Sequence, residues 1–178
     1  MKIEVRNINL MFLYRMFRIF GCNFYTNDDK YINIVKALNI KSKKERLEYV
    51  YDEAIKYINE YYSDDLCQFK NQQCIAQRKQ GGKEINGCCK KCSLVTNIGC
   101  PSVNLSCKLI YCKTALKNLK KLRFSEIPIL RCLTLTQRII LKSSFFNTRE
   151  NILMDMHKGL IYSVLRSLKM SIFFSKTK

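Results

Sequence analysis

The chain of 178 residues carries a formal net charge of +18, and hydrophobic residues make up 47% of it. This hydrophobic content excludes a disordered chain and is sufficient for a folded core. The length fits one domain, or a small core with added helices.

The apolar stretch of residues 8–20 is interrupted by Arg15 and Arg18, and no small-residue cleavage site follows it. A secretory signal peptide has an unbroken apolar run before such a site, so we expect no export. A second apolar stretch, residues 160–174, is broken by two basic residues and is too short to cross a bilayer. We therefore expect no transmembrane segment and a cytoplasmic location, where thiols stay reduced.

Residues 1–66 form a predicted helical region in which basic and acidic residues nearly balance. Thr26–Asp29 offers side-chain oxygens for the start of a helix that would end near Asn39. Ser42 and Glu45 form a capping-box pattern for a second helix. This second helix carries the most regular helical spacing of apolar residues in the chain, at Leu47, Val50, Tyr51, Ala54, Ile58, Tyr61 and Tyr62. The pattern predicts an antiparallel helical hairpin with the tyrosines in its core.

Eight of the ten cysteines lie in residues 67–112, together with four of the six glycines. Thiolates are soft ligands for zinc and iron–sulfur centres, and clustered thiols in a reducing compartment indicate metal before disulfides. Because no histidine lies in this segment, an all-sulfur site would suit structural zinc or an iron–sulfur cluster better than catalytic zinc. The predicted metal ligands are Cys67, Cys74, Cys88, Cys89, Cys92, Cys100, Cys107 and Cys112.

The spacing of these cysteines limits how they can share an ion. The pair Cys89 and Cys92 is the most specific, since two intervening residues allow a tight turn that points both sulfurs at one ion. Cys67 and Cys74 would stand about 10 Å apart along one helix. Two ligands of one ion must be closer, so either this stretch is not one continuous helix or the pair serves different centres.

Other arrangements of the thiols stay open at this point. An exported module would pair the eight cysteines as disulfides, and buried reduced cysteines would act as small apolar residues. We expect Cys22 and Cys132, outside the cluster, to be buried and reduced. Ser106 could cap a helix that begins at Cys107, and the N-terminus of a helix favours a thiolate.

Residues 113–178 hold 14 basic and three acidic residues. We expect a helix over Leu109–Phe124, with Leu116 and Leu119 directed inward and the lysines outward, and a shorter helix over Leu135–Lys142. A capping-box pattern at Asn147–Glu150 predicts a further helix. This basic region could attract nucleic acid or another polyanion, although a solvated charged surface is the simpler explanation.

These patterns together predict a mainly α fold. It consists of a helical hairpin plus C-terminal helices around an irregular cysteine-rich metal-binding segment. The three regions, residues 1–66, 67–112 and 113–178, are expected to form one compact unit.

The cysteine pattern resembles that of small bacterial cysteine-cluster proteins described as zinc- or iron-chelating. The likeness rests on the adjacent pair Cys88 and Cys89, on the run Gly87–Cys92, and on the later Cys100, Cys107 and Cys112. The chain is also similar to an uncharacterised bacterial family that carries the sequences of Cys74–Arg78 and Leu105–Lys108. The resemblance covers about a quarter of the chain, and it implies metal chelation without a defined activity.

The leading hypothesis is a metal-binding protein in which the thiolates hold zinc or an iron–sulfur cluster in a structural role. One alternative is a nucleic-acid-binding module that contacts phosphates through its basic C-terminal half. A third is an iron–sulfur or thiol-dependent redox enzyme, with Cys88 as the candidate reactive thiol. The sequence favours a non-enzymatic role, because it contains no phosphate-binding loop and no dedicated acid–base pair.

Overall fold

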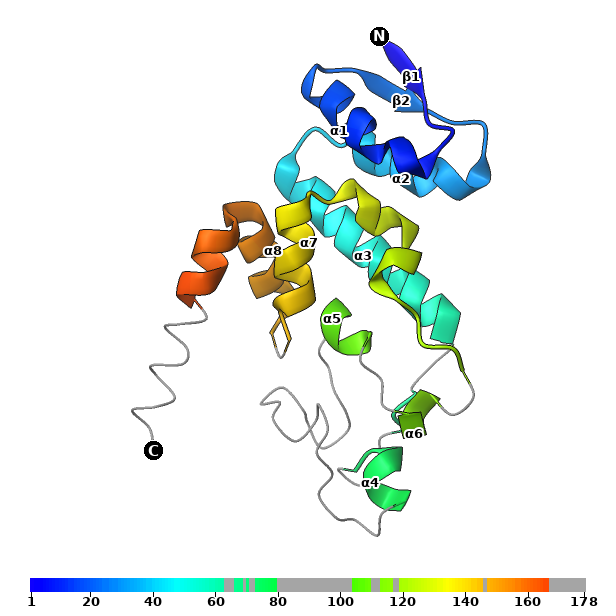
Figure 1. Cartoon of the computed structure of the whole chain (residues 1–178), viewed down its shortest axis with the longest axis vertical. Helices are drawn as coiled ribbons and strands as arrows, with labels where there is room; N and C mark the ends of the chain where they lie inside the picture. The colour runs from blue at the N-terminus through cyan, green and yellow to red at the C-terminus, as the bar shows by residue number, and fades with distance from the viewer. Residues whose placement is uncertain are drawn as a thin grey trace.

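The computed structural model describes most of the chain outside the centre of the cysteine-rich region. The described residues are 1–62, 66–68, 70, 73–79, 104–109, 113–116, 119–145 and 147–166. Their secondary structure is mainly helical, as predicted (Figure 1). None of the helices described is both long enough and apolar enough to cross a membrane.

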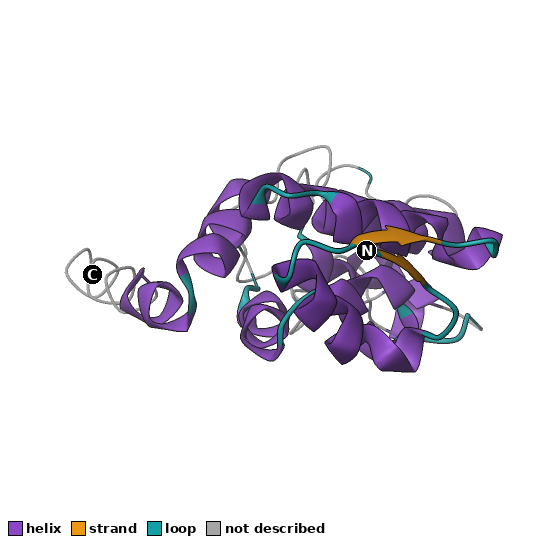
Figure 2. Cartoon of the chain, turned by 90° about the horizontal axis from the view of Figure 1, so that it is seen from above, coloured by secondary structure: helices purple, strands orange, loops and turns teal. Residues whose placement is uncertain are grey.

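The N-terminal part is a small β–α–β unit that the sequence patterns did not predict. Strand β1 (Lys2–Glu4) pairs in parallel with β2 (Asn23–Tyr25), and helix α1 (Met11–Ile19) connects them after a short 3-10 turn, η1 (Ile8–Leu10). The two strands lie over the helices in the view of Figure 2. Tyr14 and Phe24 pack edge to face, with ring centroids 6.2 Å apart, and both are buried. This contact joins α1 to β2 in the core.

The predicted helical hairpin is present as α2 (Ile32–Asn39) and α3 (Lys43–Tyr62), preceded by the 3-10 turn η2 (Asp29–Tyr31). The predicted cap at Ser42 is confirmed, because its hydroxyl accepts a hydrogen bond from the backbone N–H of Glu45 at 3.3 Å. Six of the seven apolar residues predicted to face the core from α3 are buried. The exception is Tyr61, whose side chain is 42% exposed.

The labelled α-helices of the C-terminal half are α5 (Leu105–Lys108), α6 (Lys113–Leu116), α7 (Leu135–Ser143) and α8 (Arg149–Lys158). Two 3-10 turns, η4 (Phe124–Glu126) and η5 (Pro128–Cys132), lead into α7. Gly159 ends α8 with a φ of 104°, and residues 160–166 are again helical.

Helices α7 and α8 both begin at a threonine whose side chain caps the helix. Thr134 and Gln137 form a reciprocal capping box at α7. At α8 the N-cap is Thr148, whose side chain accepts from the backbone N–H of Asn151; the cap lies one residue after the Asn147 of the predicted capping box. The two helices predicted here are therefore confirmed.

The helix predicted over residues 109–124 is wrong. Within the described part of that range α6 is a single turn, and residues 119–123 have no helical structure. Leu119, expected inside, is 49% exposed. The reason is a tertiary hydrogen bond: the backbone N–H of Leu122 donates to the hydroxyl of Tyr62 at 2.6 Å. This bond holds the chain against the end of α3 and takes the place of a helical one.

The main core lies where α3 is covered by η5, α7 and α8. Contacts join α3 to η5 and α8, and α7 to α8. The side chains that are almost fully buried there are Tyr51, Ile58, Leu130, Leu133, Ile140, Leu141, Ile152 and Met156.

Candidate functional site

Three of the eight predicted metal ligands lie within the described residues: Cys67, Cys74 and Cys107. The other five, Cys88, Cys89, Cys92, Cys100 and Cys112, lie outside them. Among the residues that the structure describes, no group of three Cys, His, Asp or Glu side chains could hold a metal ion. The predicted eight-cysteine cluster thus stays a prediction.

Cys67 and Cys74 stand at the two ends of a closed loop and do not share one helix. The backbone carbonyl of Cys67 accepts a hydrogen bond from the N–H of Ile75 at 2.8 Å. Inside the loop, Lys70 and Gln73 form an isolated antiparallel bridge, with hydrogen bonds of 2.9 and 3.0 Å. Gln68 takes a positive φ of 43°, which turns the chain. Of the two possibilities left by the spacing, the first is correct: this stretch is not continuous helix.

Cys74 is buried and directly precedes helix α4 (Ile75–Lys79). Helix α4 packs against α6, and the two lie below the end of α3 in Figure 1. Cys74, Ile75, Ala76 and Ala115 are buried but do not belong to the main core cluster, whereas Leu116 of α6 does. Helices α4 and α6 therefore form a small satellite packing unit, attached to the body of the protein through Leu116.

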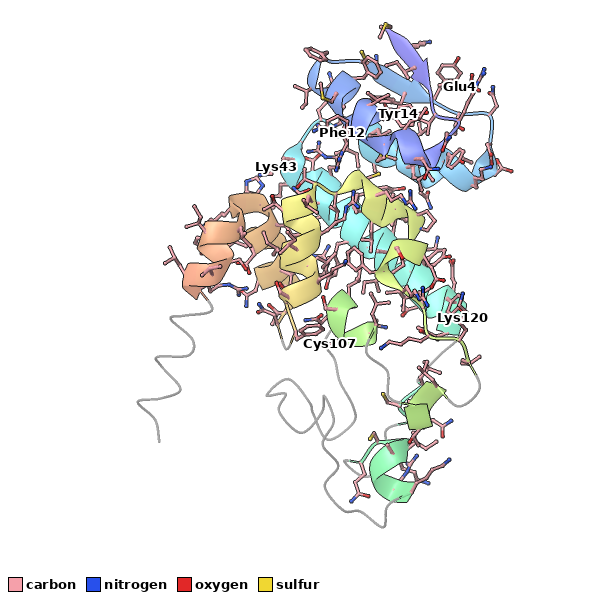
Figure 3. The ribbon with its side chains drawn as sticks, in the orientation of Figure 1. Glu4, Phe12, Tyr14, Lys43, Cys107 and Lys120 are labelled. Atoms are coloured by element: carbon pink, nitrogen blue, oxygen red, sulfur yellow. The ribbon has the colours of Figure 1, made fainter. Side chains whose placement is uncertain are left out.

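Cys107 lies on α5, which packs against α3 and α7 in the body of the protein (Figure 3). The predicted cap of this helix is wrong: Asn104, and not Ser106, is the N-cap, and its side chain accepts from the backbone N–H of Cys107 at 3.0 Å. Ser106 is buried and donates its hydroxyl to the backbone carbonyl of Leu141. The pattern misled because Asn and Ser are both good caps, and tertiary contacts decided between them.

The two cysteines outside the cluster are held differently. Cys132 is buried, as expected, and Cys22 is half-buried against the core. Burial raises the pKa of the Cys132 thiol to about 12, against the opposing charges of Arg15, Arg46, Arg138 and Arg18. This thiol therefore stays protonated at neutral pH, which is the behaviour of a structural cysteine.

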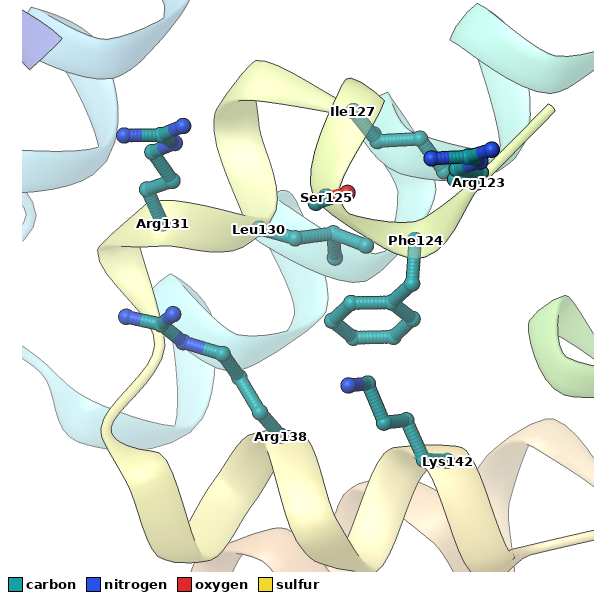
Figure 4. A pocket seen from close by; sticks show the side chains of 8 residues that line it. All are labelled: Arg123, Phe124, Ser125, Ile127, Leu130, Arg131, Arg138 and Lys142. Carbon is teal, nitrogen blue, oxygen red and sulfur yellow. The ribbon is translucent and has the colours of Figure 1, made fainter.

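A second candidate site is a pocket between the η4–η5 segment and α7 (Figure 4). Its volume is about 520 Å³ and falls in the range typical of ligand pockets. Among the described residues that line it, four are basic and none is acidic. The lining residues are Arg123, Phe124, Ser125, Ile127, Leu130, Arg131, Arg138 and Lys142.

One side of this pocket is an arginine cluster. Arg138 Nε donates to the backbone carbonyl of Leu133 at 3.1 Å, and Arg15 Nη1 donates to the same oxygen. The two guanidinium groups are thus held close together by one acceptor. Burial, and then the charges of Arg15 and Arg131, lower the pKa of Arg138. None of the ion pairs formed among the described residues involves Arg15, Arg131 or Arg138.

The charge of residues 113–178 allowed a polyanion-binding role as an alternative, but the sequence indicated no particular residue for it. Arg15 is separated from Arg131 and Arg138 by more than a hundred residues, so no local pattern could place them together. Pro128, four residues after the end of the predicted helix, was the one available signal that the chain turns here.

Comparison with known protein families, with curated proteins and with solved structures finds no match to this chain.

Proposed function

We propose that the cysteine-rich region binds a metal through thiolates, as zinc or as an iron–sulfur cluster, and that the metal is structural. The observation that carries the proposal is the closed loop between Cys67 and Cys74. The hydrogen bond from the N–H of Ile75 to the carbonyl of Cys67 brings the backbone at Cys67 beside the residue that follows Cys74. Two ligands of one ion need such a return of the chain.

The small size of the α4–α6 unit supports the same proposal. Helices of five and four residues are far below the length at which a helix is stable alone. Helix α4 directly follows Cys74, and α6 directly follows Cys112 in the sequence. Binding of a metal at the cysteine-rich segment would contribute folding free energy where the apolar contacts are few.

Metal analysis of protein purified without oxygen tests this function. We expect zinc or iron in the wild-type protein, and less of it in a Cys74→Ser variant, because serine is a poor ligand for either metal. A thiolate-to-iron absorption in the visible spectrum would distinguish a cluster from zinc. Cys22→Ser is the matched control, since Cys22 packs beside α1 and β2, and it should keep the full metal content. Wild-type protein that holds neither metal would contradict the proposal.

Binding of nucleic acid is a second candidate function, and one observation favours it. The pocket lined by Arg131, Arg138 and two further basic residues has no acidic residue among the lining residues that the structure describes. Clustered cations without acidic partners bind phosphates, with an affinity that falls steeply as salt is added. Titration of an oligonucleotide at low and high salt tests it, and absence of binding at low salt would exclude it.

The third hypothesis, an iron–sulfur or thiol-dependent redox enzyme, stays a prediction. Its candidate thiol, Cys88, lies outside the described residues.

A further inference from the structure

The pocket between the η4–η5 segment and α7 combines two kinds of surface. Arg131 and Arg138 direct their guanidinium groups to the same side of it, and the ring of Phe124 occupies its centre (Figure 4). Ile127 and Leu130, both buried, form its apolar floor. A ligand that fills this space therefore needs an anionic part and a flat apolar part.

The arginine side of the pocket is suited to a phosphate group. Arg131 donates one guanidinium N–H to the side chain of Asn9, and Arg138 uses its Nε for Leu133, so each guanidinium keeps further N–H groups. A planar guanidinium can donate two parallel hydrogen bonds to a phosphate. In the described part of the chain, no acidic residue forms an ion pair with Arg15, Arg131 or Arg138. A phosphate between the arginines would therefore reduce the repulsion among their charges.

The aromatic side of the pocket is suited to a base. Phe124 is half-buried and packs against the core, so its ring is held in place while part of it faces the pocket. The ammonium group of Lys142, an exposed residue of α7, lies over this ring, 5.0 Å from its centre. Nucleic-acid bases stack on such rings with little regard to sequence. A base stacked on this face would take the place of the ammonium group, which could then contact the adjoining phosphate.

We propose that this pocket binds one nucleotide of a single-stranded nucleic acid, with its base against Phe124 and a phosphate between Arg131 and Arg138. The inference rests on the second candidate function, and it assigns that function to one site. A single strand is required because a base inside a duplex is already stacked and cannot reach the ring. A free nucleotide has the same chemistry, and the experiment distinguishes the two sources.

The test is fluorescence anisotropy of a labelled single strand of about ten nucleotides, over salt concentrations from about 50 to 200 mM. Phe124→Leu keeps an apolar side chain for the core but removes the ring. It should weaken binding about ten-fold while leaving the salt dependence unchanged, because no charge is lost. Arg131→Gln should reduce the slope of log K against log salt by about 0.7, which corresponds to one lost phosphate contact.

Lys36→Gln is the matched charge control, because Lys36 is exposed on α2 and lies outside the pocket. It should change affinity less than Arg131→Gln does. Thermal unfolding of each variant verifies that the fold is kept. If a mononucleotide binds as tightly as the single strand, the site is assigned to free nucleotides. If the mononucleotide binds much more weakly, the site is assigned to a single strand.

The result that would overturn the inference is an unchanged affinity in Phe124→Leu together with an unchanged salt slope in Arg131→Gln. If the wild-type protein still bound the strand in that case, nucleic-acid binding would stand and only its site would be wrong. If the wild-type protein bound no oligonucleotide and no mononucleotide at low salt, the site and the second candidate function would both be rejected.

Discussion

Single polar side chains connect helices that are far apart in the sequence. Asn104 is fully buried, and its amide donates to the backbone carbonyls of Ser144 and Asn147 at 2.6 and 2.9 Å. The same side chain accepts from the backbone N–H of Cys107. One residue thus caps α5 and attaches it to the loop between α7 and α8, which leaves few alternatives for the position of Cys107.

Replacing Asn104 by alanine should therefore be costly. The variant loses a helix cap and leaves buried carbonyl groups without a donor, so we expect the free energy of unfolding to fall by about 3 kcal/mol. Urea denaturation measures this change. Asn27→Ala is the control, because Asn27 is exposed and its side chain donates to the side chain of Glu4, and it should cost less than about 0.5 kcal/mol. A loss of equal size in the two variants would show that the network around Asn104 adds nothing.

At the scale of elements, a side-chain cap together with regular apolar spacing decides how well a helix can be predicted from its own sequence. Helix α1 is as long as α7, but it has no side-chain cap and was not predicted. Helices α3, α7 and α8 have caps and regular apolar spacing, and the patterns predicted all three. Helices α4, α5 and α6 have five residues or fewer, and they depend on contacts with other elements. The strands β1 and β2 have three residues each and pair across α1, so a local pattern could not reveal them.

The satellite unit of α4 and α6 should open separately from the rest of the protein. If a metal stabilises it, adding a chelator or making Cys74→Ser should speed amide hydrogen exchange in α4 and α6 while leaving α3 protected. Exchange measured by mass spectrometry on peptides from each helix gives the result. Cys22→Ser should leave the amide hydrogen exchange of α3, α4 and α6 unchanged. Equal acceleration in α3 would contradict a separate unit, and no change in α4 would contradict its dependence on metal.

At the scale of the whole molecule, buried groups that resist ionisation should make the fold sensitive to alkali. Burial raises the pKa of Cys132 from 9.0, and that of Tyr51 from 10.0, to about 12 in each case. At a pH between the unfolded and folded pKa values, these groups keep their protons in the folded protein but have lost them in the unfolded chain. The contribution to stability is therefore complete below the unfolded pKa and falls as the pH rises toward 12.

For Cys132 we expect a loss of about 2 kcal/mol between pH 9 and pH 11. Lysines lose their charge over the same range and relieve repulsion in this basic protein, so the comparison must be made against a variant. The difference in unfolding free energy between the wild type and Cys132→Val should shift by that amount in favour of the variant as the pH rises. A difference that stays constant with pH would show that Cys132 ionises as readily in the folded protein as in the unfolded chain.

The sequence alone determined the mainly α class, the hairpin of α2 and α3, and the presence of α7 and α8, because caps and helical spacing act within a few residues. Only the tertiary structure decided what lies far apart in the chain. It closed the loop from Cys67 to Cys74, made Asn104 the cap of α5, and brought Arg15 to Arg131 and Arg138. These contacts depend on how whole elements pack, and packing is not encoded in any short stretch of sequence.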